Sequence, residues 1–69
     1  MKNQKHIEAL AFLLKQSGAD LAQTKMTCMM LHNSKDALEE MIVFLKDKPS
    51  LLQITDKLMY LHKKYCENR

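Results

Sequence analysis

The stretch SGADLAQT, residues 17–24, decides how many helices the chain forms. Gly18 suits the left-handed conformation that commonly follows the last turn of a helix. Asp20 and Gln23 have the spacing of a capping box, in which the side chain at each position bonds the backbone of the other. These signals predict that one helix ends and a second begins within this stretch.

The same stretch also permits one continuous helix. Apolar and small residues recur three and four apart through it, at Ile7, Leu10, Leu14, Ser17, Leu21, Thr24, Cys28 and Leu31. This is heptad spacing, and a Gly inside a helix costs only about 1 kcal/mol relative to Ala. We favour the break, because the cap signals coincide there.

The remainder of the chain carries the signals of two more helices. Ser34 suits the start of one helix, and Pro49 follows its end, because the residue before a proline disfavours the helical conformation. Ser50 and Gln53 repeat the spacing of a capping box, at which the last helix begins. The sequence therefore predicts helices over residues 4–17, 21–32, 35–47 and 51–67.

Apolar residues recur at helical spacing, and no segment shows the alternation typical of a β-strand. The last helix has the most regular apolar stripe, formed by Leu51, Ile54, Leu58, Leu61 and Tyr65. With 69 residues, the chain makes one domain at most, over residues 1–69. We predict an all-α fold, a small antiparallel bundle of three or four helices joined by short turns.

Composition argues against several classes of protein. One Gly, one Pro and 46% hydrophobic residues are untypical of a disordered chain or of a loop-rich disulfide fold. No apolar run approaches the roughly 18 residues that a membrane span needs. Two cysteines are too few for a secreted disulfide framework. We therefore expect a cytoplasmic protein that does not associate with membranes.

The helix over residues 21–32 has apolar residues nearly all round. Its expected core side carries Leu21, Cys28 and Leu31, and the other side carries Ala22, Met26, Met29 and Met30. A helix of this kind is normally buried, and so short a chain has few elements with which to surround it. We therefore expect a non-catalytic regulatory or adaptor protein that self-associates, as a homodimer or larger homo-oligomer, or binds a protein partner. The residues expected to make that contact are Phe12, Met26, Met29, Met30 and Val43.

Two Cys and two His form a candidate metal site. Cys28 and His32 are four residues apart, as are His62 and Cys66, so each pair projects from one face of its helix. The second and fourth helices of an antiparallel bundle run parallel, which places both pairs at the same end. Zinc prefers tetrahedral Cys and His ligands. We favour the simpler interpretation, with no cofactor, in which the cysteines are small buried hydrophobic residues and the histidines lie where the helix dipole favours them.

The last helix also carries a basic face, formed by Lys57, Tyr60, Lys63 and Lys64, in a chain of net charge +3. Lysine neutralises phosphate and tyrosine can stack on a base. A nucleic-acid-associated regulator is therefore the alternative function. We rank it second, because a solvated helix face has the same composition and the only arginine is Arg69.

No group of side chains predicts catalysis. Glu39 and Glu40 are adjacent in the sequence, so they point in different directions and do not form a facing pair of carboxyl groups. The serines at positions 17, 34 and 50 all fall at turns or helix caps, which accounts for them. We expect that the protein is not an enzyme.

Overall fold

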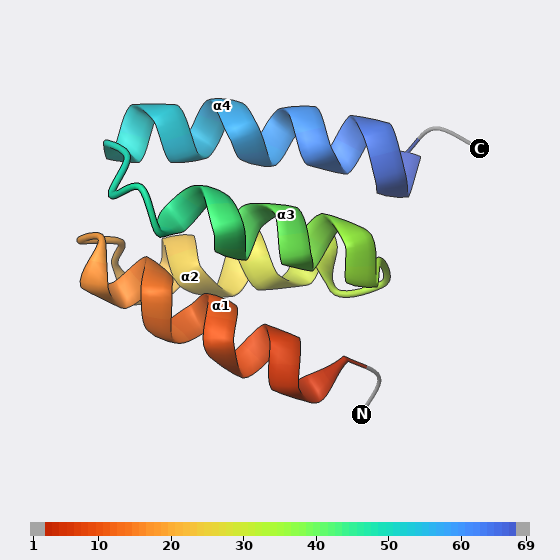
Figure 1. Cartoon of the computed structure of the whole chain (residues 1–69), viewed down its shortest axis with the longest axis horizontal. Coiled ribbons are helices and arrows are strands. Elements are labelled where there is room, and N and C mark those ends of the chain that lie inside the picture. The colour runs from red at the N-terminus through yellow and green to blue at the C-terminus, as the bar shows by residue number, and fades with distance from the viewer. Residues whose placement is uncertain (1–2, 68–69) are drawn as a thin grey trace.

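Four α-helices and a π-helical segment follow one another along the chain (Figure 1). The structure is a computed structural model, and it describes residues 3–67. The elements are α1 (Gln4–Gln16), α2 (Leu21–Leu31), α3 (Lys35–Leu45), α4 (Leu51–Leu61) and η1 (His62–Glu67). The described residues include no β-strand, so the predicted all-α class is confirmed. None of these helices is both long enough and apolar enough to span a membrane.

The chain leaves its first helix at Gly18, as the cap signals predicted. Gly18 has a φ of 96°, a value that glycine adopts far more readily than other residues. The backbone N–H groups of Gly18 and Ala19 donate hydrogen bonds to the carbonyl oxygens of Lys15 and Leu14, at 3.1 and 3.0 Å. This pair of bonds is the Schellman motif of a helix C-terminus. The continuous-helix alternative is therefore wrong.

Both predicted capping boxes are formed. The backbone N–H of Gln23 donates to Oδ1 of Asp20 at 2.8 Å, and the backbone N–H of Asp20 donates to Oε1 of Gln23 at 3.0 Å. Ser50 and Gln53 make the equivalent pair of bonds at 2.9 and 3.2 Å. Each box satisfies two backbone donors that the first turn of a helix leaves without a partner. Helices α2 and α4 therefore begin where the sequence predicted.

The last predicted helix changes its hydrogen-bond pattern before it ends. Helix α4 stops at Leu61, and the next six residues form the π-helical segment η1. Backbone bonds in a π-helix join residue i to residue i+5, so the side chains that follow leave the spacing of an α-helical stripe. Tyr65 of η1 donates a hydrogen bond to Glu40 of α3, which holds this segment against its neighbour. The expectation of one regular α-helix to Glu67 is corrected accordingly.

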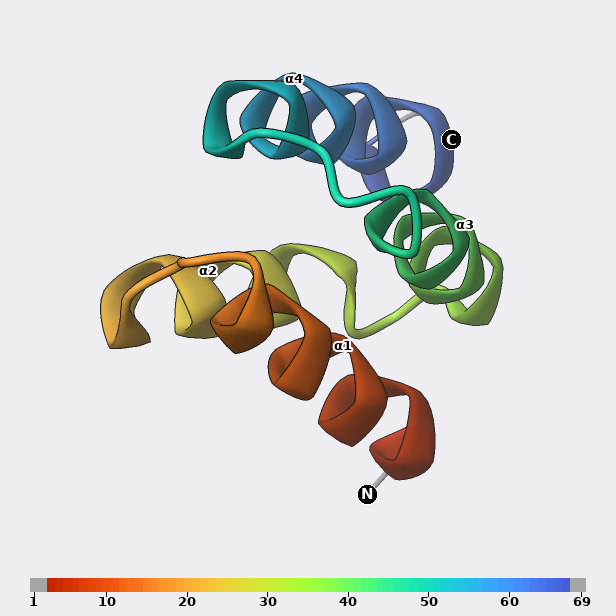
Figure 2. The ribbon, with the colours of Figure 1, turned by 60° about the vertical axis from the view of Figure 1, so that its left-hand side comes forward.

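One cluster of buried side chains forms the core: Leu10, Leu14, Leu31, Ala37, Leu38, Met41, Leu45, Ile54, Leu58 and Leu61. Helix α3 lies between α1 and α4 (Figures 1 and 2) and contributes four of these residues. Helix α2 packs against α1, α3 and η1, yet it contributes only Leu31 to the cluster. The burial of α2 therefore differs from that of the other helices.

Threonines, rather than methionines, occupy the inward side of α2. Thr24 and Thr27 are each 4% exposed. Their hydroxyl groups donate to the carbonyl oxygens of Asp20 and Gln23, one turn earlier, at 2.9 and 2.8 Å. Because each hydroxyl finds its partner within the helix, burying it leaves no unsatisfied polar group. This local bonding makes threonine acceptable at the core.

The outward side of α2 is correspondingly apolar. Met26 and Met29 are 61% and 69% exposed, and Leu21, which we expected on the core side, is 68% exposed. The two steps of three residues from Thr27 through Thr24 to Leu21 each turn the side-chain direction by about 60°. Leu21 therefore lies outside the buried stripe, and the expectation that it is on the core side was wrong.

Candidate functional site

Residues of α2, most of them apolar, and the first residue of η1 line a shallow recess of ≈ 600 Å³. Its lining residues, called the methionine face below, are Ala22, Lys25, Met26, Met29, Met30 and His62. Met30 packs partly against the core, whereas Met26 and Met29 project outward. Methionine is flexible and polarisable, so such a lining can adapt to the shape of an apolar partner.

The structure brings together three of the five residues predicted to bind a partner. Met26, Met29 and Met30 all belong to the methionine face. Val43, 64% exposed on α3, lines a different hollow. Phe12, 60% exposed on α1, lines neither of the two. The predicted set therefore divides over three parts of the surface.

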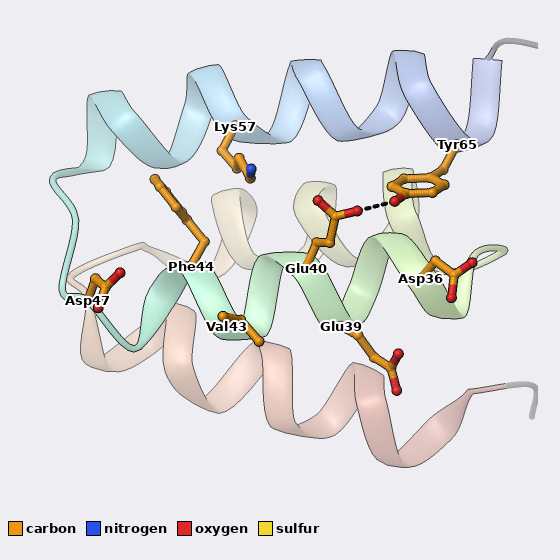
Figure 3. Close-up of a pocket in the computed structure, with 8 residues that line it drawn as sticks. All are labelled: Asp36, Glu39, Glu40, Val43, Phe44, Asp47, Lys57 and Tyr65. Atoms are coloured by element: carbon orange, nitrogen blue, oxygen red, sulfur yellow. Dashed lines mark hydrogen bonds between the residues drawn. The ribbon is translucent and has the colours of Figure 1, made fainter.

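A second hollow, of ≈ 470 Å³, lies along α3 where α3 faces α4 and η1 (Figure 3). Its lining residues, called the acidic groove below, are Asp36, Glu39, Glu40, Val43, Phe44, Asp47, Lys57 and Tyr65. This lining therefore contains four carboxylates and one ammonium group. Within α3, Glu39 and Glu40 lie three and four residues after Asp36, and Asp47 follows seven residues after Glu40, just beyond the helix. This spacing is visible in the sequence, but we did not predict a groove from it.

The carboxylates at the centre of the acidic groove have partners within the chain. Tyr65 donates its hydroxyl to Glu40, and the ammonium group of Lys64 lies 3.7 Å from Oε2 of Glu40. The hydrogen bond from Tyr65 is the main reason that the pKa of Glu40 lies below its ordinary value, and the charge of Lys64 acts in the same direction. Nε2 of His6 lies 3.2 Å from Oε2 of Glu39.

The carboxylates at the two ends of the acidic groove differ from the central pair. Asp36 lies in the first turn of α3 and Asp47 follows the last turn. Among the residues that the structure describes, neither forms an ion pair. Val43 lies between them in the sequence and is largely exposed. The groove thus has one largely exposed apolar side chain, Val43, and a negatively charged side chain toward each end.

The predicted basic face lies beside the acidic groove. The ammonium groups of Lys57 and Lys64 lie 5.2 and 5.6 Å from the centre of the Tyr60 ring, so two cations lie close to this ring. Lys63 is exposed next to them. Lys64 also pairs with Glu40. The four predicted residues are therefore close in space, but carboxylates lie next to them.

The four predicted metal ligands do not converge on one point. Cys28 turns toward α1, and its Sγ donates to the carbonyl oxygen of Ile7 at 4.0 Å. His32, the C-cap of α2, has its Nδ1 2.7 Å from the carbonyl oxygen of Met29. Within the described part of the chain, no three His, Cys, Asp or Glu side chains are arranged to hold a metal ion. The helical spacing brought each pair to one helix face, but the two pairs have different surroundings.

His62 belongs to the methionine face, and Cys66 is partly buried against the core. Both Cys28 and Cys66 are free thiols, and burial raises the pKa of each above its ordinary value. A thiol with a raised pKa is protonated at neutral pH and is a poor nucleophile. The two cysteines therefore have the character of small, partly buried hydrophobic residues.

No family model, curated protein or solved structure matches this chain.

Proposed function

We propose that this protein is a non-catalytic protein–protein interaction module, built as a small antiparallel helical bundle, that self-associates through the methionine face. The observation that carries the proposal is which side of α2 faces the core. Thr24 and Thr27 are 4% exposed, while Met26 and Met29 are more than half exposed. A chain that buries threonine and exposes methionine on the same helix retains apolar surface suited to binding.

The energetics favour covering this surface. Burying a large apolar side chain that was exposed stabilises association by about 1.5–3 kcal/mol. Met26 and Met29 lie next to each other around one recess, so a single partner can cover both. Contiguous apolar patches on small proteins commonly mark interaction sites. Self-association also adds buried surface to a chain whose size limits its own core.

The experiment is sedimentation velocity over a concentration series. The wild type is expected to form oligomers, and Met29→Asp to shift the equilibrium toward monomer by at least about tenfold in Kd, because a carboxylate must then be desolvated at the contact. Leu52→Asp is the matched control, because Leu52 is 72% exposed and lines neither hollow. Circular dichroism verifies that both variants stay folded. A wild type that remains monomeric up to millimolar concentration contradicts self-association.

We place the module in the cytoplasm, where the free thiols of Cys28 and Cys66 stay reduced. We propose a regulatory or adaptor role for the module. Such a role requires only that the methionine face be covered and uncovered as concentration or partners change.

The second candidate function is binding of nucleic acid through the basic face, and one observation favours it. Tyr60 is 53% exposed and has the ammonium groups of Lys57 and Lys64 beside its ring. Lysines beside an exposed aromatic ring suit a single strand with stacked bases. We rank it second because the acidic groove adjoins these lysines and repels phosphate. Retardation of single-stranded DNA that weakens steeply with salt, and is lost in Lys63→Glu, would support it.

A further inference from the structure

We infer that the self-association is head to tail, with the methionine face of one copy docked in the acidic groove of the next. This inference rests on the proposed function and adds which two surfaces meet. It begins from the chemistry of the methionine face. That lining contains Lys25 and His62 and, among the residues that the structure describes, no carboxylate.

A symmetric dimer would place the methionine face against itself. A two-fold contact brings the same patch of both copies together, so each Lys25 would meet a surface that has no negative charge to pair with it. Like charges facing each other across an interface are unfavourable. A surface that is apolar and negatively charged suits the methionine face better than a second methionine face does.

The acidic groove of the same chain is such a surface. Val43 is 64% exposed and lies between Asp36 and Asp47, which form no ion pair among the described residues. The methionines of a second copy can cover Val43 while Lys25 of that copy meets one of these carboxylates. Glu39 and Glu40 already pair with His6 and Lys64, so the negative charge that complements the methionine face comes from Asp36 and Asp47.

The dimensions of the two surfaces also correspond. Helix α2 has 11 residues and is therefore about 16 Å long. Asp36 lies in the first turn of α3 and Asp47 just beyond its last turn, so the groove extends along α3, which also has 11 residues. The recess of ≈ 470 Å³ in the acidic groove is open along this length to outward-projecting side chains such as Met26 and Met29.

The two surfaces lie on different sides of the molecule. Figure 3 views the acidic groove from outside, and α2 passes behind α3 in that view. No residue lines both surfaces. One copy therefore can use both at once, and a contact between unlike surfaces repeats from copy to copy into a ring or an open chain.

The test uses two variants, each with one altered surface. Met29→Asp places a carboxylate in the methionine face, and Val43→Lys places an ammonium group in the acidic groove. Both positions are more than 60% exposed, so both variants are expected to fold; Met26→Asp and Asp47→Lys serve as second choices. Leu52→Asp is again the control that leaves both surfaces intact. Native mass spectrometry, with one variant isotopically labelled, identifies every complex by its mass.

Each variant alone is expected to be monomeric. One of its two surfaces is intact, but the surface that would bind it is altered in every copy in the sample. Mixed together, the two are expected to form a 1:1 complex and nothing larger, in which the methionine face of Val43→Lys occupies the acidic groove of Met29→Asp. The control is expected to assemble like the wild type.

Three other results would overturn the inference. If Val43→Lys assembles like the wild type while Met29→Asp does not, the contact is symmetric, and the proposed function stands without the head-to-tail arrangement. If the two variants stay monomeric when mixed, the two surfaces do not bind each other. If the wild type itself is monomeric, self-association fails together with the inference.

Discussion

Tyr65 in η1 donates a hydrogen bond to Glu40 in α3, and these two residues are 25 positions apart in the sequence. The ammonium group of Lys64 approaches the same carboxylate to 3.7 Å and lies 5.0 Å from the centre of the Tyr65 ring. One carboxylate thus holds an aromatic ring and a cation where α3 faces η1. This arrangement has consequences for stability that can be measured.

Replacing Tyr65 with Phe keeps the ring and removes only the hydroxyl group. The variant is expected to have a lower free energy of unfolding than the wild type, since Glu40 loses its hydrogen-bond donor. The measurement is urea denaturation followed by circular dichroism. Tyr60→Phe is the matched control, because Tyr60 is 53% exposed and its contacts with Lys57 and Lys64 involve the ring. Equal effects of the two substitutions would contradict a structural role for the Tyr65 hydroxyl.

The same hydrogen bond makes stability depend on pH at the acidic end of the range. The pKa of Glu40 is lower in the folded protein than its ordinary value of 4.5, chiefly because of Tyr65. Its stabilising contribution is therefore complete above pH 4.5 and is lost as the pH falls through the lowered folded value. We expect the difference in melting temperature between wild type and Tyr65→Phe to shrink as the pH is lowered through this window. A difference that stays constant down to full protonation would show that the contact does not involve the charged carboxylate.

At the alkaline end the sign is opposite. The hydrogen bond to Glu40 raises the pKa of Tyr65 above its ordinary value of 10.0. A raised pKa means that the folded state holds the proton more tightly, so this contribution is complete below pH 10.0 and is lost as the pH rises through the folded value. Spectrophotometric titration is expected to show the late ionisation of Tyr65, and Tyr65→Phe is expected to remove that step.

Gly18 is expected to resist substitution for a conformational reason. Its φ is 96°, and a Cβ added there would meet nothing within 4 Å, so an alanine would suffer backbone strain without a clash. Gly18→Ala is expected to lower the free energy of unfolding by about 1–2 kcal/mol, and Gly18→Asn by less, because asparagine tolerates positive φ better. Urea denaturation compares the two. Equal losses for Ala and Asn would argue against backbone strain as the cause.

Thr24 is expected to tolerate loss of its hydroxyl. The carbonyl oxygen of Asp20 accepts both the hydroxyl and the backbone N–H of Thr24, each at 2.9 Å, so it keeps one donor in Thr24→Val. The free energy of unfolding is expected to stay within about 0.5 kcal/mol of the wild type or to rise. Leu31→Ala, at a fully buried position on the same helix, is expected to cost about 2–5 kcal/mol. A loss in Thr24→Val comparable to that of Leu31→Ala would mean that the hydroxyl has a larger role.

Parts of the candidate site could be anticipated and parts could not. Met26, Met29 and Met30 recur on one side of a short helix, so their grouping was predictable from spacing. His62 joins them only because η1 packs against α2, which spacing within one helix does not reveal. Spacing within one helix also does not reveal the surroundings of the predicted metal ligands, which do not converge. Cys28 faces α1 and His32 bonds the backbone of its own helix.

The sequence by itself determined where α2, α3 and α4 begin and where α1 ends, because caps and breaks depend on residues a few positions apart. Gly18, the Asp20–Gln23 box and the Ser50–Gln53 box each act through local hydrogen bonds. Tertiary structure decided which side of α2 is buried. Apolar residues surround that helix, so its own pattern selects no face. Helices α1 and α3 and the segment η1 enclose the side that carries Thr24 and Thr27. The two threonines can face inward there because their hydroxyls are satisfied within the helix. The exposure of Met26 and Met29 follows from that orientation of α2, which only the packing of distant segments could set.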